Sequence, residues 1–525
     1  MNRNEMLSAL QASTAPWDIL IVGGGATGLG CAVDAAARGY RTLLLERSDF
    51  AQGTSSRSTK LIDGGVRYLQ QGNVGLVLEA LRERGLLTQN APHLVSHLSF
   101  VVPNYTWWEA PFYGVGLKLY DLLAGRLGLG PSRHLSREAT LDHIPTLQPE
   151  GLRGGIVYYD GQFDDARLAI SLAQTAVDRG AVVLNYLPVI GLLKRNELVR
   201  GVIARDLESD QTYELTARAV INATGVFADS VRRLDDPAAS EMIAPSQGVH
   251  LVLDQSFLPG DSAIMVPRTD DGRVLFVIPW HDRALVGTTD TPVTPPQLEP
   301  RPLPGEIDFL LAHAARYLTQ KPKPEDVLSA FAGLRPLIKN EGARDTASMP
   351  RDHTVLVSKS GLVTVTGGKW TTYRKMAEDT VNQAVLVADL EECPCTTTQL
   401  RLHGWSERGD LQTAGLPAHW TLYGAEVPAL QALARENPKW NEPLHPNLPY
   451  RGVEVVWAVR HEMARTVEDV LSRRTRALLL DTRASVEVAP KVAGWMAEEL
   501  GCDRQWKQKQ VTSFCELAQG YLVGT

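Results

Sequence analysis

The chain has 525 residues, of which 44% are hydrophobic and 22% are charged, and its formal net charge is −7. This length is enough for two or three domains with a large core, and nothing in the charge balance indicates a nucleic-acid partner. Five cysteines are too few for a disulfide framework, and their spacing predicts no metal site. The first residues lack the apolar stretch of a signal peptide, and no apolar run approaches the roughly 18 residues of a membrane span. We therefore expect a cytoplasmic protein that touches a membrane only from its surface.

The most informative stretch lies close to the N-terminus. Residues 18–22 (DILIV) predict a short buried strand, which runs into the glycine-rich residues 23–28. Small residues at 29–38 indicate a helix, and a second strand at 41–45 ends in Glu46. Strand, G-x-G-x-x-G, helix, strand and acid together form the fingerprint of a dinucleotide-binding domain. The pattern predicts a bound ADP moiety and leaves FAD and NAD open.

Each part of the fingerprint has a physical role. Gly23 permits a tight turn, Gly25 lets the backbone approach a pyrophosphate, and Gly28 lets the helix pack closely on the strand. Glu46 can accept hydrogen bonds from a ribose diol. The hydroxyl-rich residues 48–60 follow, and we expect this loop to wrap the cofactor with its hydroxyl and backbone N–H groups.

A family resemblance begins in this loop. Residues 54–70, TSSRSTKLIDGGVRYLQ, resemble the signature of the FAD-dependent glycerol-3-phosphate dehydrogenases, a membrane-associated family that reduces quinone. Further motifs of the family follow in the same order: APHLV (91–95), DDARL (164–168), INATG (221–225), FVIPW (276–280), GTTD (287–290), GLRPL (333–337) and GGKWTTYRK (367–375). The resemblance covers about residues 17–390, and residues 448–474 resemble the family's C-terminal helical region.

This resemblance implies an α/β fold with three domains. They are an FAD domain of the two-dinucleotide-binding type, an α+β substrate domain with an antiparallel sheet, and a C-terminal helical domain. We expect the FAD domain at 17–75, 151–235 and 326–390, the substrate domain at 76–150 and 236–325, and the helical domain at 391–525.

The expected FAD site joins the fingerprint to two later glycine-containing turns. The strand ending in INATG returns the chain to the cofactor, and the strand LVTVT (362–366) runs into a glycine pair that can set backbone N–H groups against the flavin. The predicted cofactor residues are Gly23, Gly25, Gly28, Glu46, Thr54, Ser55, Ser56, Lys60, Gly64, Gly65, Ala223, Thr224, Gly225, Gly367, Gly368 and Lys369.

A phosphate-bearing substrate needs several cations that converge on one pocket, with arginine preferred for its fork of donors. The family motifs offer such groups close to the expected flavin, whereas a carboxylate substrate could be held by one arginine and a tyrosine. The predicted substrate residues are Arg67, Tyr68, Arg335, Arg351 and Lys369, and Arg335 is also expected to serve catalysis.

The base that takes the substrate's hydroxyl proton is harder to assign. His250 matches a family position near the substrate, and His353 is a weaker candidate. The family usually carries a histidine where this chain has Asp63, and Asp63 could act as the base only if its pKa matched the task. We expect Asp63 either to pair with a cation, Arg57 and Lys60 being close in sequence, or to point away from the flavin.

The resemblance implies oxidation of sn-glycerol 3-phosphate to dihydroxyacetone phosphate, with FADH₂ reoxidised by membrane quinone. The alternatives are an oxidase that uses O₂ and a catalytically impaired flavin-binding homologue. Residues 105–129 concentrate aromatic and leucine side chains, which predicts either a buried helix or a surface that enters the membrane interface. We expect a peripheral protein on the inner face of the cell membrane, and a homodimer is left open.

Overall fold

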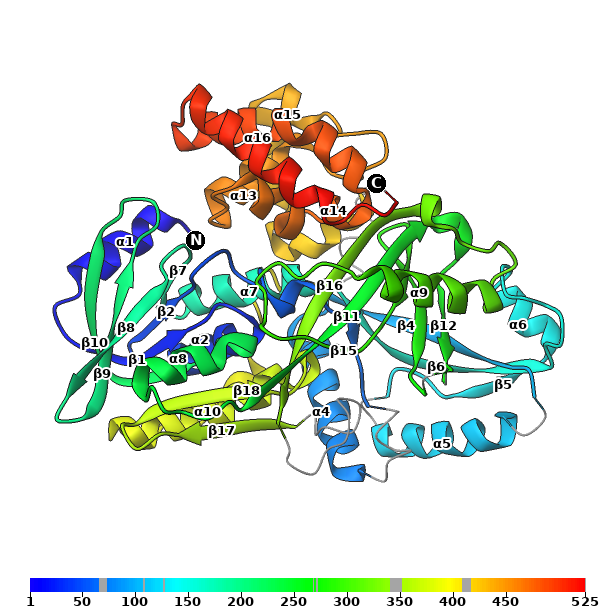
Figure 1. Cartoon of the computed structure of the whole chain (residues 1–525), viewed down its shortest axis with the longest axis horizontal. Coiled ribbons are helices and arrows are strands. Elements are labelled where there is room, and N and C mark those ends of the chain that lie inside the picture. Colours follow the sequence, from blue (N-terminus) through cyan, green and yellow to red (C-terminus); the bar gives the residue numbers. More distant parts are fainter. Residues whose placement is uncertain are drawn as a thin grey trace.

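The computed structural model of the chain describes residues 1–65, 73–106, 109–125, 128–267, 269–270, 272–339, 352–407 and 417–524, and of residues 109–115 it describes the backbone only. Two large sheets lie side by side in these residues, and C-terminal helices cover them from above in Figure 1. The predicted α/β fold with a C-terminal helical region is confirmed.

The first sheet has eight strands in the order β17-β18-β10-β1-β2-β7, with β9 attached to β10 and β8 to β9. Its centre is parallel, and only the pairs that involve β17, β8 and β9 are antiparallel. Ile19, Leu20 and Ile21 have no exposed surface, and because neighbouring side chains point to opposite faces, both faces must be covered. The strands are β1 (Trp17–Val22), β2 (Thr42–Leu45), β7 (Val182–Leu184), β8 (Val189–Arg195), β9 (Leu198–Arg205), β10 (Thr212–Asn222), β17 (His353–Val357) and β18 (Leu362–Gly367).

Helices cover the first sheet and share its core. Buried residues of α2, α7 and α10 belong to the same apolar cluster as the central strands. These helices are α2 (Ala26–Ala37), α7 (Asp165–Asp178) and α10 (Tyr373–Ala388), and the peripheral helices are α1 (Arg3–Ala12) and α8 (Ala228–Asp235). The predicted strand, helix and strand of the fingerprint are confirmed at β1, α2 and β2.

The second sheet has ten strands in the order β15-β11-β14-β13-β12-β4-β6-β3, with β16 beside β11 and β5 beside β6. All of its pairs are antiparallel except β4 with β12. Its strands are β3 (Leu61–Ile62), β4 (Val95–Asn104), β5 (Arg133–Leu135), β6 (Gly154–Phe163), β11 (Ile243–Asp254), β12 (Ser262–Val266), β13 (Leu275–Trp280), β14 (Arg283–Gly287), β15 (Thr291–Pro292) and β16 (Val327–Ile338). Its helices are α4 (Val74–Asn90), α5 (Glu109–Ala124), α6 (Arg137–His143) and α9 (Pro304–Tyr317).

The sheets do not divide the chain at the predicted domain boundaries. Strands β6 and β16 belong to the second sheet, although both fall inside ranges assigned to the FAD domain. β16 pairs with β11 along nearly its whole length. β16 is thus a strand of the second sheet, and the chain after it returns to the first sheet at β17 and β18. The domain boundaries remain an interpretation.

The C-terminal part is helical and packs as a separate layer, drawn in orange and red in Figure 1. It contains a six-residue π-helical turn, Asp469–Arg474. No helix in the parts of the chain that the structure describes is both long and apolar enough to span a bilayer. The helices are α12 (Val427–Glu436), α13 (Gly452–His461), α14 (Ala477–Leu480), α15 (Thr482–Leu500) and α16 (Arg504–Gln519).

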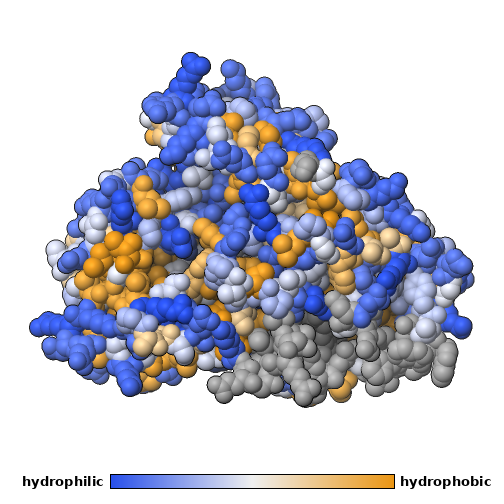
Figure 2. Space-filling view, in the orientation of Figure 1, coloured by the Kyte–Doolittle hydropathy of each residue, from blue (hydrophilic) through white to orange (hydrophobic). Residues whose placement is uncertain are grey.

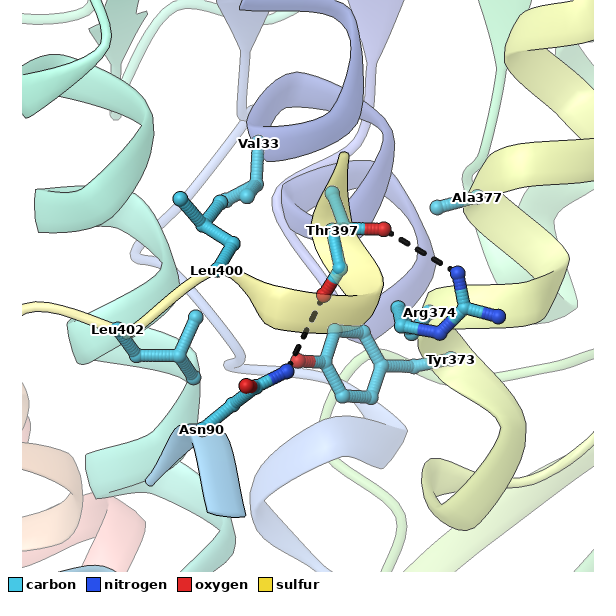
Figure 3. A pocket seen from close by; sticks show the side chains of 9 residues that line it. Val33, Asn90, Tyr373, Arg374, Ala377, Thr397, Leu400 and Leu402 are labelled. Atoms are coloured by element: carbon cyan, nitrogen blue, oxygen red, sulfur yellow. Dashed lines mark hydrogen bonds between the residues drawn. The ribbon is translucent and has the colours of Figure 1, made fainter. Parts of the chain in front are cut away.

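One small cavity lies where several segments pack together, and it is too small to bind a substrate. It lies between α2, α10 and the segment around Thr397, where Asn90 donates to the Thr397 carbonyl and Arg374 to its hydroxyl (Figure 3). Its volume is about 10 Å³, which is room for about one water molecule.

In the face seen in Figure 2, polar residues cover most of the C-terminal helices, and apolar residues gather in patches over the two sheets.

Candidate active site

The fingerprint glycines close the crossing of β1, α2 and β10. Gly23 has φ +112°, and a Cβ there would lie 2.6 Å from the Ala223 carbonyl oxygen. A Cβ on Gly28 would lie 1.8 Å from the Gly23 carbonyl oxygen. Gly25 is different, because a Cβ there would meet only the Ser55 hydroxyl, at 3.0 Å, in front of the first turn of α2. Gly23 and Gly28 are therefore required by packing, and Gly25 keeps the helix N-terminus accessible.

Glu46 and Ser55 order the backbone around this helix N-terminus. The Glu46 carboxylate accepts from the Gly24 N–H at 2.6 Å and from the Ser48 N–H at 2.9 Å. Burial raises the pKa of this carboxyl. The Ser55 hydroxyl accepts from the Ala26 N–H at 2.9 Å. We call residues 47–60 the cofactor loop, because they follow Glu46 and pass the N-terminus of α2.

The two later turns arrive at the same edge of the first sheet. β10 lies between β1 and β18, and all three are parallel, so their carboxyl ends meet there. The Thr224 hydroxyl donates to Asn222 Oδ1 at 2.7 Å. Gly367 and Gly368 have φ of +82° and +72°, which favours glycine at both positions. The structure thus brings the fingerprint, residues 223–225 and residues 367–369 together, and this set of small residues around an open helix N-terminus fits a dinucleotide.

Not every predicted cofactor residue has a free polar group. The Gly64 N–H donates to Asp160, and the Gly65 N–H donates to Asp63 Oδ1 at 2.7 Å. Thr54 Oγ1 donates to the Leu334 carbonyl oxygen at 2.5 Å. The Ser56 carbonyl oxygen accepts from Lys60 Nζ at 2.8 Å.

Lys60 differs most from its predicted role. Its side chain is fully buried, and its ammonium group lies 2.6 Å from the Asp165 carboxylate. The rings of Trp280 and Phe331 flank it, with their centroids 5.3 and 5.1 Å from Nζ. Burial lowers the pKa of Lys60 to about 8. A cofactor phosphate would need this ammonium group at the surface of the site, so Lys60 organises the loop from within.

The second half of the site is one face of the second sheet. In the antiparallel pair β11–β16, His250 lies opposite Phe331, and Gly248 lies opposite Gly333. Directly opposed residues and those two positions apart share a face, so Arg335 lies on this face as well. A Cβ on Gly248 would lie 2.4 Å from Arg335 Nη2. Gly248 therefore makes room for the Arg335 guanidinium on the same sheet face as the His250 imidazole.

The cofactor loop packs on this same sheet face. A Cβ on Gly333 would lie 2.7 Å from the Arg57 carbonyl oxygen, so the loop backbone rests on the glycine. Thr59 Oγ1 and His250 Nε2 form a hydrogen bond of 2.9 Å. The loop therefore contacts both the dinucleotide-binding motif and the sheet face that carries His250 and Arg335.

His250 is held as a neutral imidazole. Its side chain is 2% exposed and stacks on Phe331, with the ring centroids 5.0 Å apart. Burial, followed by the charges of Lys60 and Arg335, holds the pKa of His250 well below its ordinary value of 6.5. Nδ1 has no hydrogen-bond partner in the described parts of the chain. His250 therefore keeps one ring nitrogen available for a proton.

Arg335 and Lys369 are the predicted phosphate cations that lie within the described residues. Arg335 Nη2 donates to the Thr289 carbonyl oxygen at 3.0 Å, and Nη1 lies 3.4 Å from Asp290 Oδ1. Lys369 Nζ lies 3.4 Å from Asp63 Oδ2. Both side chains are partly exposed, at 24% and 17%. Both cations are therefore within reach of a ligand.

Asp63 pairs with a cation, as predicted. This cation is Lys369, and it is neither Arg57 nor Lys60, which are closer in sequence. Arg57 pairs with Glu299, and Lys60 is held by Asp165. Arg67, Tyr68 and Arg351 lie outside the described residues, and their predicted roles remain predictions.

Sequence reasoning missed several residues that shape the site. Thr59 lies inside the first family motif, and Asp165 lies inside DDARL, but neither carried a signal of its own. Trp370 donates its indole N–H to the Ser55 carbonyl oxygen at 2.9 Å. His353, the weaker base candidate, is bound to Asp379 at 3.0 Å.

The comparisons with known proteins agree with this geometry. Residues 18–374 match the family of FAD dependent oxidoreductases, and residues 364–509 match the C-terminal domain of alpha-glycerophosphate oxidase. The chain therefore belongs to the FAD-dependent oxidoreductases, and FAD is its cofactor.

The relatives narrow the class. The human mitochondrial glycerol-3-phosphate dehydrogenase is 42% identical, over 97% of this chain and 74% of its own length. The Arabidopsis thaliana mitochondrial enzyme is 40% identical, over 97% of this chain and 87% of its own. A Bacillus halodurans glycerol-3-phosphate dehydrogenase solved with FAD matches with a TM-score of 0.81 and 31% identity, covering 99% of this chain and 97% of that chain. The chain is thus a member of the glycerol-3-phosphate dehydrogenase family.

Proposed function

We propose that this chain oxidises sn-glycerol 3-phosphate to dihydroxyacetone phosphate and passes the two electrons to membrane quinone. The observation that carries the proposal is the face of β11 and β16 under the cofactor loop. There a buried neutral imidazole, His250, and a partly exposed guanidinium, Arg335, lie on one sheet face, on either side of the Gly248–Gly333 pair. A small substrate with an alcohol at one end and a phosphate at the other matches this pair.

Each residue has a role that its surroundings support. Arg335 binds the phosphate through charge-assisted hydrogen bonds, and Lys369 adds a second cation at the flavin turn. His250 takes the proton of the secondary hydroxyl, because its lowered pKa keeps the imidazole neutral at pH 7. Bound FAD supplies the acceptor for the hydride that leaves the same carbon. The sheet face and the cofactor loop shield the His250 imidazole from water, while Arg335 remains partly exposed.

The test is anaerobic mixing of the purified holoenzyme with sn-glycerol 3-phosphate, followed by flavin absorbance. The flavin should bleach within the turnover time, and glycerol at the same concentration should bleach it far more slowly because it lacks the phosphate. A flavin that stays oxidised with sn-glycerol 3-phosphate contradicts the proposed activity and favours the impaired homologue. In air, a stoichiometric yield of hydrogen peroxide from substrate would identify an oxidase instead of a quinone-linked dehydrogenase.

We further propose that the enzyme reaches quinone by lying on the membrane with α4 and α5 toward the lipid. These helices pack on each other through a small apolar cluster. Among the side chains that the structure describes on these helices, four apolar ones remain exposed, including Leu122 of α5, which is 76% exposed. Tyr120 of the same helix faces inward and bonds to Arg84 and Asp160. Trp107 and Trp108 lie outside the described residues, and the side chain of Phe112 is likewise not described.

Exposed leucines at the surface of a folded helix favour contact with the interface of a bilayer. Leu119→Ser with Leu122→Ser should reduce binding to vesicles of phosphatidylglycerol and phosphatidylcholine while turnover with a water-soluble dye persists. Leu386→Ser is the matched control, because Leu386 is 62% exposed on α10, on the first sheet. Equal vesicle binding by both variants would contradict this orientation. The peripheral position on the inner face of the cell membrane is part of the same proposal.

A further inference from the structure

Three arginines at the base of the helical domain are buried against the cofactor loop. The π-helical turn Asp469–Arg474 contains Arg473 and Arg474, and Arg476 follows it. Each of the three is at most 2% exposed. Buried arginines are rare unless paired, because removing the charge from water is costly. Their partners are therefore informative.

Two of the arginines converge on Asp49 of the cofactor loop. Arg474 donates to both carboxylate oxygens of Asp49, with distances of 2.7 and 2.8 Å. Arg473 Nε donates to Asp49 Oδ2 at 2.6 Å. Asp49 itself is fully buried, yet the arginines hold the pKa of its carboxyl near 2. Asp49 lies three residues after Glu46, and Ala51, two residues further on, donates its N–H to the Gly24 carbonyl oxygen at 2.9 Å, so the anchored segment contacts the glycine motif.

The third arginine fixes the other half of the loop. Arg476 Nη2 donates to the Ser56 carbonyl oxygen at 2.7 Å and lies 3.2 Å from Asp165 Oδ1. Lys60 binds the same carbonyl and the same carboxylate. The Asp165 carboxylate also accepts from the backbone N–H and the hydroxyl of Ser58. Arg476 is thus bound to the backbone next to Ser55, whose hydroxyl caps α2.

We propose that Arg473, Arg474 and Arg476 are positioning residues for FAD, which fix the cofactor loop from the side opposite to the ligand. The loop conformation that receives FAD then depends on the helical domain, and FAD release depends on contacts made by residues more than 400 positions later in the chain. Because such coupling is reciprocal, bound FAD also stabilises the docking of the helical domain.

The alternative is that these arginines only hold two domains together. The chain provides a matched control for that case, because Arg465 of the helical domain pairs with Glu208 at 2.7 Å, and this contact does not touch the loop. Removing Arg465 weakens the same domain interface without touching Asp49 or Ser56.

The experiment compares Arg474→Met, Arg474→Lys and Arg465→Met as holoenzymes, at a temperature well below their unfolding midpoints. FAD release after dilution is followed by the rise in flavin fluorescence, and hydrogen exchange is measured on peptides covering residues 48–60. Arg474→Met should release FAD faster than Arg465→Met by roughly 5- to 150-fold, the usual range of coupling between sites, and the loop peptides should exchange faster. Arg474→Lys, which keeps the charge but loses the fork, should fall between the two.

Equal release from Arg474→Met and Arg465→Met, or exchange that rises evenly over both domains, would overturn the proposal. If Arg474→Met yields no folded holoenzyme, Arg476→Lys is judged by the same two measurements. Neither readout requires turnover, so the result is independent of whether the chain oxidises sn-glycerol 3-phosphate.

Discussion

Replacing Thr59 with valine removes the hydroxyl that bonds to His250 and keeps the shape of the side chain. Thr59 Oγ1 lies 2.9 Å from His250 Nε2, inside a site where the imidazole is 2% exposed. A hydrogen bond between neutral groups contributes about 0.5–1.5 kcal/mol, which corresponds to about two- to thirteenfold in rate. We expect flavin reduction by sn-glycerol 3-phosphate to slow by this factor. Stacking on Phe331 still holds the ring, so the loss should stay far below that of removing the base.

The assay is the anaerobic reductive half-reaction in a stopped-flow instrument, with Thr59→Ser as the variant that restores the hydroxyl. Thr59→Ser should recover most of the wild-type rate, and His250→Ala should lose roughly 10²- to 10⁴-fold, the usual contribution of a general base. If Thr59→Val reduces as fast as the wild type, the hydrogen bond does not orient His250. If it loses as much as His250→Ala, then Thr59 does more than position the ring, and the reasoning is equally wrong.

Three other predictions concern the same site. Arg335→Ala should lower kcat/KM for sn-glycerol 3-phosphate roughly ten- to a hundredfold, because a hydrogen bond to a charged group contributes about 1.5–3 kcal/mol; an unchanged ratio to glycerol in steady-state assays would exclude the anchor. In a plot of the rate of flavin reduction against pH, the acid limb should lie below pH 6.5, since the lowered pKa keeps His250 neutral until more acid pH. The unfolded chain binds this proton at a higher pH than the folded one, so the contribution of His250 to the free energy of unfolding should also fall below pH 6.5. Asp63→His should keep or raise kcat, whereas loss of flavin reduction in Asp63→Asn would make Asp63 the base.

The structure of the dinucleotide-binding motif could be predicted because the residues that determine it are close together in sequence. The turn at Gly23, the close packing at Gly28 and the acid at Glu46 all lie within 24 positions of one another, and each follows from backbone geometry. The predicted strand at 18–22 and the helix at 29–38 therefore agree with β1 and α2 within a few residues. The largest shift is at the start of α2, because the helix already begins at Ala26, inside the glycine motif.

Side-chain partners could not be predicted, because sequence distance does not give direction. Arg57 and Lys60 are the cations close to Asp63 in sequence, but the loop turns Arg57 toward Glu299 and Lys60 toward Asp165. Lys369 reaches Asp63 only because β18 and β3 end at the junction of the two sheets. No periodicity in the sequence encodes this meeting.

The buried arginines illustrate a second limit. The resemblance of residues 448–474 to the family's C-terminal helical region predicts helices there, and arginines in a helical region are mostly exposed. The π-helical turn instead directs Arg473 and Arg474 inward onto Asp49. π-turns are rare and often lie at functional sites, and apolar periodicity does not distinguish such a turn from an α-helical one.

The ion pairs of this site fall into two groups with different uses. Lys60 and Asp165 lie 2.6 Å apart with no exposed surface, which is the geometry of a fixed structural pair. Arg335 and Lys369 each face a carboxylate at 3.4 Å and remain partly exposed. A pair longer than the usual 2.7–2.9 Å of a charge-assisted bond is weaker, and the Asp290 and Asp63 pairs are of this kind. The buried pair of Lys60 and Asp165 therefore fixes the cofactor loop, whereas the two longer pairs lie at the partly exposed cations that we propose for the phosphate.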